Sequence, residues 1–290
     1  IAESNSMNEA AKKLFVSQPN LSATVREVEE ELGITVFMRN NRGITVTAEG
    51  EEFLGYAKQV VEQYHLLENR YLNVESKKKF SVSMQHYSFA VKAFVQLAKE
   101  VGMDEYEFAV HETKTKEVID NVKNLKSEIG VLYLSDFNEK VLRKLFKECD
   151  IEFKELFTCN TYVYLWKKHP LAGQKEITLD DLQEYPCLTF EQGVNNSFYY
   201  AEEMMSTYEY KRVIKADDRA TMLNLMVGLN GFTLCSGIIS EDLNGDDYAA
   251  IPLKESEKMH IGYIKHKGTK LSKLGEIYID ALKNYENKVL

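Results

Sequence analysis

The stretch SMNEAAKKLFVSQPNLSATVREVEEELG (residues 6–33) decides the fold of the first part of the chain. Ser6 can cap a first helix, in which small and apolar side chains recur at helical spacing. Residues 15–17 are too few for another element and read as a tight turn. Ser17 can then cap a second helix with Pro19 in its first turn, where the missing backbone N–H does no harm. The segment predicts a helix-turn-helix.

The second of these helices combines an apolar stripe with a polar face. Its apolar residues follow one another at intervals of four, three and four and are expected to form one buried face: Leu21, Val25, Val28 and Leu32. The other face carries donors and acceptors that can reach base edges in a DNA major groove: Gln18, Asn20, Ser22, Thr24 and Arg26.

A short hairpin follows the two helices. Residues 36–39 and 44–46 are strand-like runs, and the segment Asn40-Asn41-Arg42-Gly43 between them contains residue types that tolerate positive φ. Arg39 and Arg42 lie at or beside its tip, where they can contact phosphates. We predict a winged helix-turn-helix DNA-binding domain over residues 1–47, with its opening helix largely missing. The alternative is a small helical domain that has a hairpin by chance.

The charge of this region argues against DNA binding, because readers of DNA usually carry a basic patch. The five basic residues are Lys12, Lys13, Arg26, Arg39 and Arg42. The six acidic residues are Glu3, Glu9, Glu27, Glu29, Glu30 and Glu31. Most of the acids cluster late in the second helix, which would point away from the groove. The net charge of −9 for the whole chain means that any contact with nucleic acid must be local.

Residues 48–79 are predicted to form a linker helix and a hinge. Thr47 is a plausible N-cap, and acidic residues follow it. Apolar residues recur every three or four positions and form one seam about three heptads long, as a coiled coil requires. The seam residues are Leu54, Ala57, Val60, Tyr64, Leu67, Tyr71 and Val74. We expect this helix to pair with a second copy. The alternative is an amphipathic helix packed on its own domain.

From residue 80 the pattern changes to alternating strands and helices, which implies a parallel sheet with helices on both faces. The expected strands cover residues 80–84, 106–111, 129–134, 162–166, 187–190, 213–216, 232–235 and 261–265. The expected helices cover residues 89–101, 116–125, 219–227 and 271–285, and another begins at 178–182. We predict two α/β subdomains, I (about 80–158 and 266–290) and II (about 159–265), with a cleft where strands end.

Polar residues at the strand ends are candidates for binding a small-molecule effector. Gln85, His86, Tyr87 and Ser88 lie where a first strand meets a helix N-terminus, which favours an anionic group. Other strands are followed by Thr113, Ser135, Thr189 and Gln192. Each residue taken singly is more readily explained as a helix cap or loop residue. Together they indicate a small-molecule cleft.

The sequence contains no catalytic set, so an enzyme is not expected. It has no glycine-rich phosphate loop and no nucleophile-elbow motif. Cys149, Cys159, Cys187 and Cys235 are scattered without metal-ligand spacing, so neither a metal nor a cofactor is expected. No apolar run approaches the roughly 20 residues of a membrane span, and no signal peptide is visible. A cytoplasmic protein with reduced thiols is the simplest expectation.

The chain resembles the LysR-type transcriptional regulators. The resemblance rests on AAKKLFVSQPNLS (residues 10–22), VEEELG (residues 28–33) and the motifs around Phe37 and Thr45. It extends to His169-Pro170-Leu171-Ala172 and to Asp180-Asp181-Leu182, and so covers the whole chain.

The resemblance implies a winged DNA-binding domain, a dimerising linker helix and an effector domain of two subdomains similar to periplasmic binding proteins. It also implies a homotetramer that acts as a ligand-responsive activator or repressor. By similarity, Gln18, Pro19, Asn20 and Ser22 would face the groove, with Arg42 on the wing. The chain departs from the family at Ala23, where many members carry Arg, and at Thr24, often Gln; the Arg departure puts one DNA contact in doubt.

Two alternatives to a ligand-controlled regulator remain open at the level of the sequence. One is a redox sensor that uses cysteines as its switch, although Cys149 and Cys159 lack basic neighbours that would clearly lower a thiol pKa. The other is a solute-binding or enzymatic α/β protein with a fused interaction domain.

Overall fold

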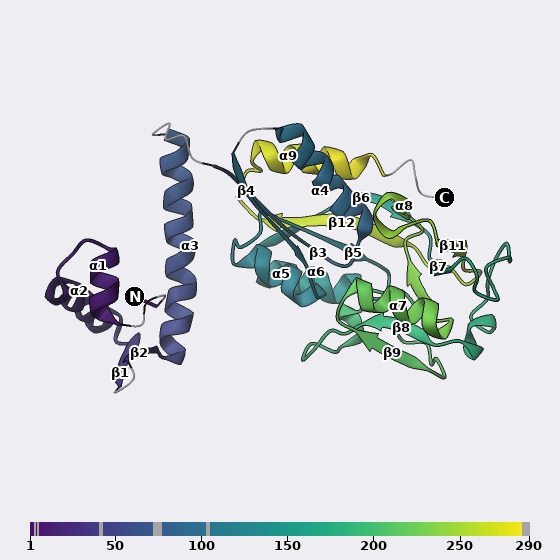
Figure 1. Cartoon of the computed structure of the whole chain (residues 1–290), viewed down its shortest axis with the longest axis horizontal. Helices are drawn as coiled ribbons and strands as arrows, with labels where there is room; N and C mark the ends of the chain where they lie inside the picture. Colours follow the sequence, from purple (N-terminus) through teal and green to yellow (C-terminus); the bar gives the residue numbers. More distant parts are fainter. Residues whose placement is uncertain (3, 5, 41–42, 72–76, 103–104, 286–290) are drawn as a thin grey trace. The chain divides into compact units, whose positions relative to one another are not determined.

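The computed structural model describes the chain except for residues 3, 5, 41–42, 72–76, 103–104 and 286–290 (Figure 1). The chain forms two compact units, Ile1–Glu75 and Ser76–Leu290. The elements of the first unit are α1 (Met7–Lys13), α2 (Gln18–Leu32), β1 (Phe37–Asn40), β2 (Gly43–Val46) and α3 (Ala48–Tyr71).

Both helix starts predicted for the helix-turn-helix are confirmed. The Ser6 side chain accepts a hydrogen bond from the Glu9 N–H at 3.2 Å, and the Ser17 side chain accepts one from the Asn20 N–H at 3.3 Å. Phe15 adopts a positive φ of 54° in the turn between the helices. The predicted hairpin is also present, as the antiparallel pair β1–β2.

The hairpin is fastened both to α2 and to α3. The Glu29 carboxylate of α2 accepts hydrogen bonds from the N–H groups of Val36 and Phe37, at 2.7 and 3.0 Å. At Gly50, in the first turn of α3, a Cβ atom would lie 2.3 Å from the carbonyl oxygen of Val36. Only glycine therefore allows α3 to begin this close to the hairpin.

The apolar stripe of α2 is less covered than the sequence predicts. Leu21, Val25 and Val28 are half-buried, but Leu32 is 51% exposed. Helix α1 buries Met7, Ala10 and Ala11, and two of these three side chains are short alanines.

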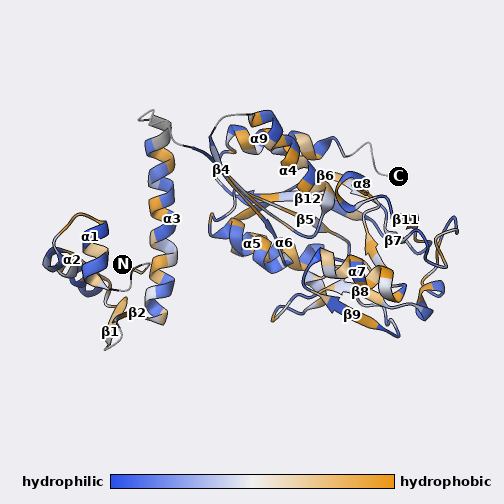
Figure 2. Ribbon diagram, viewed as in Figure 1, coloured by the Kyte–Doolittle hydropathy of each residue, from blue (hydrophilic) through white to orange (hydrophobic). Residues whose placement is uncertain are grey.

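Figure 2 shows hydrophobic residues spaced along α3, and several apolar side chains of this helix are exposed. These are Tyr56, Val60, Val61, Tyr64, Leu66 and Leu67, between 51% and 68% exposed. Of the predicted seam, Val60, Tyr64 and Leu67 are exposed, whereas Leu54 and Ala57 are half-buried, so pairing of α3 with a second copy stays a prediction. Val74 lies outside the described residues.

Subdomain I of the second unit is built on a five-stranded sheet, in the order β4-β3-β5-β12-β6. Its strands are β3 (Lys78–Met84), β4 (Tyr106–Glu112), β5 (Ile129–Leu134), β6 (Ile151–Cys159) and β12 (Met259–His266). Its helices are α4 (Ser88–Val101), α5 (Thr115–Lys123), α6 (Glu139–Glu148) and α9 (Lys273–Lys283). One core packs α4 and α9 on the sheet, and a second core packs α5 and α6 on it.

Subdomain II contains a three-stranded sheet in the order β10-β7-β11 and a parallel pair, β8–β9. Its strands are β7 (Tyr162–Trp166), β8 (Cys187–Phe190), β9 (Val213–Ala216), β10 (Thr233–Cys235) and β11 (Tyr248–Pro252). Its helices are α7 (Arg219–Leu229), α8 (Glu241–Asn244) and the 3-10 turns η1 (Asp181–Glu184) and η2 (Phe198–Tyr200). The helix start expected at 178–182 is thus a 3-10 turn.

Two expectations about subdomain I need correction. Its sheet is mixed rather than parallel, because β12 runs antiparallel to both β5 and β6. The chain also returns from subdomain II earlier than residue 266, since β12 begins at Met259. The strand that carries the chain back pairs over its whole length in the sheet of subdomain I.

Candidate functional site

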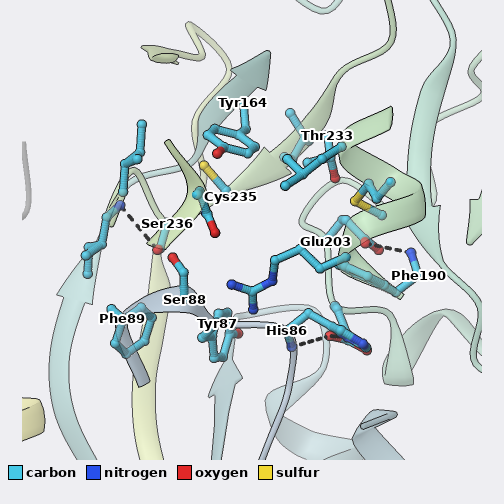
Figure 3. Close-up of a pocket in the computed structure, with 18 of the residues that line it drawn as sticks. His86, Tyr87, Ser88, Phe89, Tyr164, Phe190, Glu203, Thr233, Cys235 and Ser236 are labelled. Atoms are coloured by element: carbon cyan, nitrogen blue, oxygen red, sulfur yellow. Dashed lines mark hydrogen bonds and ion pairs between the residues drawn. The ribbon is translucent and has the colours of Figure 1, made fainter. Parts of the chain in front are cut away.

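A pocket lies between the two subdomains, at the end of β3 and the start of α4 (Figure 3). About 740 Å³ inside it is free of protein atoms, part of it open to solvent. Figure 3 shows Tyr87 and Ser88 on one side and Tyr164, Cys235 and Thr233 on the other.

The amino terminus of α4 offers unused hydrogen-bond donors to this pocket. Tyr87 is the N-cap residue in extended conformation, and no side chain caps the helix. The N–H groups of Ala90 and Val91 donate to the Tyr87 carbonyl, whereas those of Ser88 and Phe89 have no acceptor among the described residues. Such N–H groups, together with the helix dipole, favour an anion.

His86 is held between the subdomains by Glu202 and Phe190. Its backbone N–H donates to the Glu202 carboxylate at 2.9 Å, and its ring Nδ1 lies 2.8 Å from the same oxygen. The ring stacks on Phe190 with centroids 3.7 Å apart. Gln192 donates to the other Glu202 oxygen at 2.9 Å. Both oxygens of Glu202 are therefore occupied within the protein.

Glu203 is a second carboxylate at the pocket and is buried. The Phe190 N–H donates to it at 2.8 Å. Burial raises the pKa of the Glu203 carboxyl to about 8, and the neighbouring Glu202 adds to the rise. Among the described residues no cation forms an ion pair with Glu203, whereas Glu202 has the His86 ring.

Further polar groups come from subdomain II. The hydroxyls of Thr233 and Tyr164 line the pocket and are buried, and that of Thr233 has no hydrogen-bond partner among the described residues. Arg219, the first residue of α7, also lines the pocket and forms an ion pair at 2.6 Å with Glu112 of subdomain I. The rest of the lining is largely apolar, including Met222 and Met226.

Three of the eight predicted effector residues line this pocket: His86, Tyr87 and Ser88. Gln85 is turned into the protein, where its Oε1 accepts from Tyr133 N–H and Tyr87 hydroxyl, at 3.2 and 2.9 Å. Gln192 is buried against Glu202 and Thr115, so it supports the pocket without lining it.

The other three predicted residues lie elsewhere. Thr113 hydrogen-bonds to Glu117 beside a separate surface hollow on β4 and α5. The Ser135 N–H donates to Asn138 in a turn before α6. Thr189 is half-buried on β8 and does not line the pocket.

Most of the polar lining was not predicted from the sequence. The polar lining residues that were not predicted are Tyr164, Glu202, Glu203, Arg219, Thr233, Cys235, Ser236 and Asn244. Asp218-Arg219 begins a predicted helix, and that was a usable signal for Arg219. Glu202 and Glu203 lie in irregular structure between η2 and β9, where no periodicity marks them.

The cysteines show no sign of activated thiolates. All four are free; Cys149, Cys159 and Cys187 are buried. Burial raises the pKa of both the Cys159 and the Cys235 thiols to about 12. The structure therefore does not favour the redox-sensor alternative. No group of three or more potential metal ligands occurs among the described residues.

The polar residues of α2 occupy its accessible side. Pro19, Asn20, Thr24 and Arg26 are exposed, while Gln18 and Ser22 are half-buried and joined by a hydrogen bond of 2.7 Å. Arg39 is in β1, and Arg42 lies outside the described residues. No helix that the structure describes is both long and apolar enough to cross a bilayer.

These features define a class: a DNA-binding regulator with a helix-turn-helix and wing in one unit and an effector-binding α/β fold in the other. Comparison with protein families agrees. Residues 1–51 match the bacterial regulatory helix-turn-helix protein model of the lysR family, and residues 104–286 match the LysR substrate binding domain. The chain belongs to the LysR family of transcription regulators, and it is not an enzyme.

Individual relatives extend over nearly the whole chain. The HTH-type transcriptional regulator CysL of Bacillus subtilis (strain 168) is 26% identical over 303 residues, covering 100% of this chain and 96% of its own. TdcA of Escherichia coli (strain K12) is 21% identical over 300 residues, covering 99% and 90%.

Solved structures share the fold. Full-length OxyR from Pseudomonas aeruginosa has a TM-score of 0.65 at 17% identity, covering 96% of this chain and 90% of that one. HinK, a LysR family transcriptional regulator from Pseudomonas aeruginosa, has a TM-score of 0.52 at 19% identity, covering 100% and 96%.

Proposed function

We propose that this regulator acts in the cytoplasm of a bacterium, binds promoter DNA as a dimer or tetramer, and responds to a small effector with an anionic group. The effector occupies the pocket at the amino terminus of α4. The observation that carries this proposal is a pair of N–H groups, those of Ser88 and Phe89, that have no acceptor in the described part of the chain and lie at a pocket between two subdomains.

The DNA-binding part of the proposal rests on the exposed side of α2. Gln18, Pro19, Asn20, Ser22, Thr24 and Arg26 would face the major groove, with Arg39 and Arg42 on the wing near phosphates. The self-association part rests on the exposed apolar stripe of α3, because a stripe of this length is stable in water only when it is covered. Two paired copies present two recognition helices to two half-sites.

The DNA contacts can be separated by mutation. Ser22→Ala should reduce discrimination between operator and mutated operator by about 1–3 kcal/mol, because it removes a base-edge contact. Arg42→Ala should weaken binding to all sequences and lower the salt slope by about 1, because it removes a phosphate contact. Titrations at several salt concentrations measure both effects, after footprinting has located a site with two half-sites. If both variants lose affinity equally on every sequence, the assigned roles are wrong.

The anion site can be tested by placing a charge at its centre. Ser88→Asp puts a carboxylate in the first turn of α4, where the helix dipole tolerates it, and it should abolish binding of carboxylate effectors. Ser88→Asn is the neutral control of similar size. The measurement is the shift in melting temperature of the full chain with a panel of small carboxylic acids. If Ser88→Asp keeps the shift seen in the wild type, the effector binds elsewhere.

A further inference from the structure

We infer that the effector is an α-amino acid with an apolar side chain, whose ammonium group pairs with Glu203 while its carboxylate binds the amino terminus of α4. This inference rests on the proposed function, because it takes the pocket to be the effector site. It adds a cationic group and an apolar side chain to the anionic group already proposed.

Glu203 is a buried acid to which the described residues supply no cation. The carboxylate is buried and accepts hydrogen bonds from backbone N–H groups, including that of Phe190 at 2.8 Å. No ion pair joins it to any described Lys, Arg or His. Desolvation of an isolated charge is costly, so without a cation the buried Glu203 carboxyl keeps its proton, as its raised pKa shows. A ligand ammonium in the pocket would stabilise the ionised form and pair with it.

Glu202 is the less suitable partner for a ligand cation. Its two oxygens already accept from His86 and Gln192, at 2.8–2.9 Å. Glu203 therefore remains as the pocket carboxylate without a cation.

The two charged ends of an amino acid lie close together, so their binding groups must also lie close together. Tyr87, the N-cap residue of α4, lines the same pocket as Ser88 and Glu203, so both binding groups face one small cavity.

The remaining lining suits an apolar side chain. Met222, Leu223, Met226 and Ile239 are among the residues that surround the pocket. The buried Thr233 hydroxyl, which has no partner among the described residues, is an additional polar group that points to a ligand. Small-molecule sites commonly combine mostly apolar walls with a few polar groups that fix orientation.

The test uses L-leucine and two analogues that each lack one charge. Isothermal titration of the full-length chain compares L-leucine with 4-methylpentanoate, which lacks the ammonium, and 3-methylbutylamine, which lacks the carboxylate. We expect L-leucine to bind about tenfold or more tighter than either analogue. L-alanine, L-valine and L-phenylalanine measure the size preference of the apolar part.

The role of Glu203 is tested by Glu203→Gln, which keeps an oxygen for the Phe190 N–H. This variant should bind L-leucine no better than 4-methylpentanoate. Glu209→Gln changes an exposed carboxylate on the same segment and should keep the wild-type preference. If Glu203→Gln fails to fold, the comparison of analogues on the wild type decides alone.

The outcomes separate this inference from the proposed function. Equal affinity of wild type for L-leucine and 4-methylpentanoate, with loss of both in Ser88→Asp, overturns the amino-acid inference and leaves the anion site intact. A leucine preference that survives in Glu203→Gln also overturns it. If none of these amino acids or carboxylates binds the wild type, both the inference and the proposed anionic effector are contradicted.

Discussion

Replacing Val60 and Leu67 of α3 together by glutamate is expected to turn the protein into a monomer that no longer binds its operator tightly. Both side chains are exposed in the single chain, at 68% and 57%, and they lie seven residues apart on the predicted seam. Burying one such side chain contributes about 1.5–3 kcal/mol, and a dimer buries four. The dimer dissociation constant should therefore rise by at least about 10⁴-fold.

Sedimentation measures the change in mass, and a titration with a two-half-site operator measures the loss of DNA affinity. The matched control is Gln59→Glu with Gln63→Glu, which adds the same charge to α3 away from the predicted seam. The control variant should keep the oligomeric state of the wild type. A Val60/Leu67 variant that stays dimeric would show that α3 is not the pairing surface.

Glu203→Gln is expected to make the second unit more stable than wild type at high pH. The pKa of Glu203 is raised from 4.5 to about 8 in the folded chain. Between these values the unfolded chain releases a proton that the folded chain keeps, so wild-type stability falls as pH rises from 4.5 to 8. Below pH 4.5 the raised pKa has no effect on the free energy of unfolding. Above pH 8 the wild type carries the full loss of stability. At about 1.4 kcal/mol per pKa unit, the penalty is on the order of 4–5 kcal/mol.

Urea unfolding at pH 5 and pH 9, followed by the fluorescence of Trp166, measures this difference. Trp166 is the only tryptophan of the chain and lies on β7 in the second unit. We expect wild type and Glu203→Gln to be similar at pH 5 and to diverge at pH 9. Glu209→Gln should follow wild type throughout. A difference that is the same at both pH values would mean that Glu203 does not titrate as described.

Much of the fold was predictable because the strands of this chain are compact apolar runs bounded by turn residues. β5, β7, β8 and β9 begin and end where the sequence predicts. The hairpin and the helix caps at Ser6 and Ser17 were predictable for the same local reasons. The direction of β12 was not predictable, because it is decided by pairing with strands at least 100 residues earlier in the chain.

The site was only partly predictable because strand ends do not determine the direction of a side chain. Gln85 and His86 are neighbours, yet Gln85 turns inward to Tyr133 while His86 faces the pocket. The two acidic residues that line the pocket, Glu202 and Glu203, come from a segment without regular secondary structure. Their approach to His86 and Phe190 depends on tertiary packing that no local pattern shows.

The contact at Gly50 has a consequence for the geometry of operators. Because α3 begins in direct contact with the Val36 carbonyl, and Glu29 links the hairpin to α2, helices α2 and α3 move as one rigid body. In a dimer joined through α3, the crossing angle of the two α3 helices would then determine the distance between the two copies of α2. A change of a few degrees in that angle would select operators of different spacing without altering a single base contact.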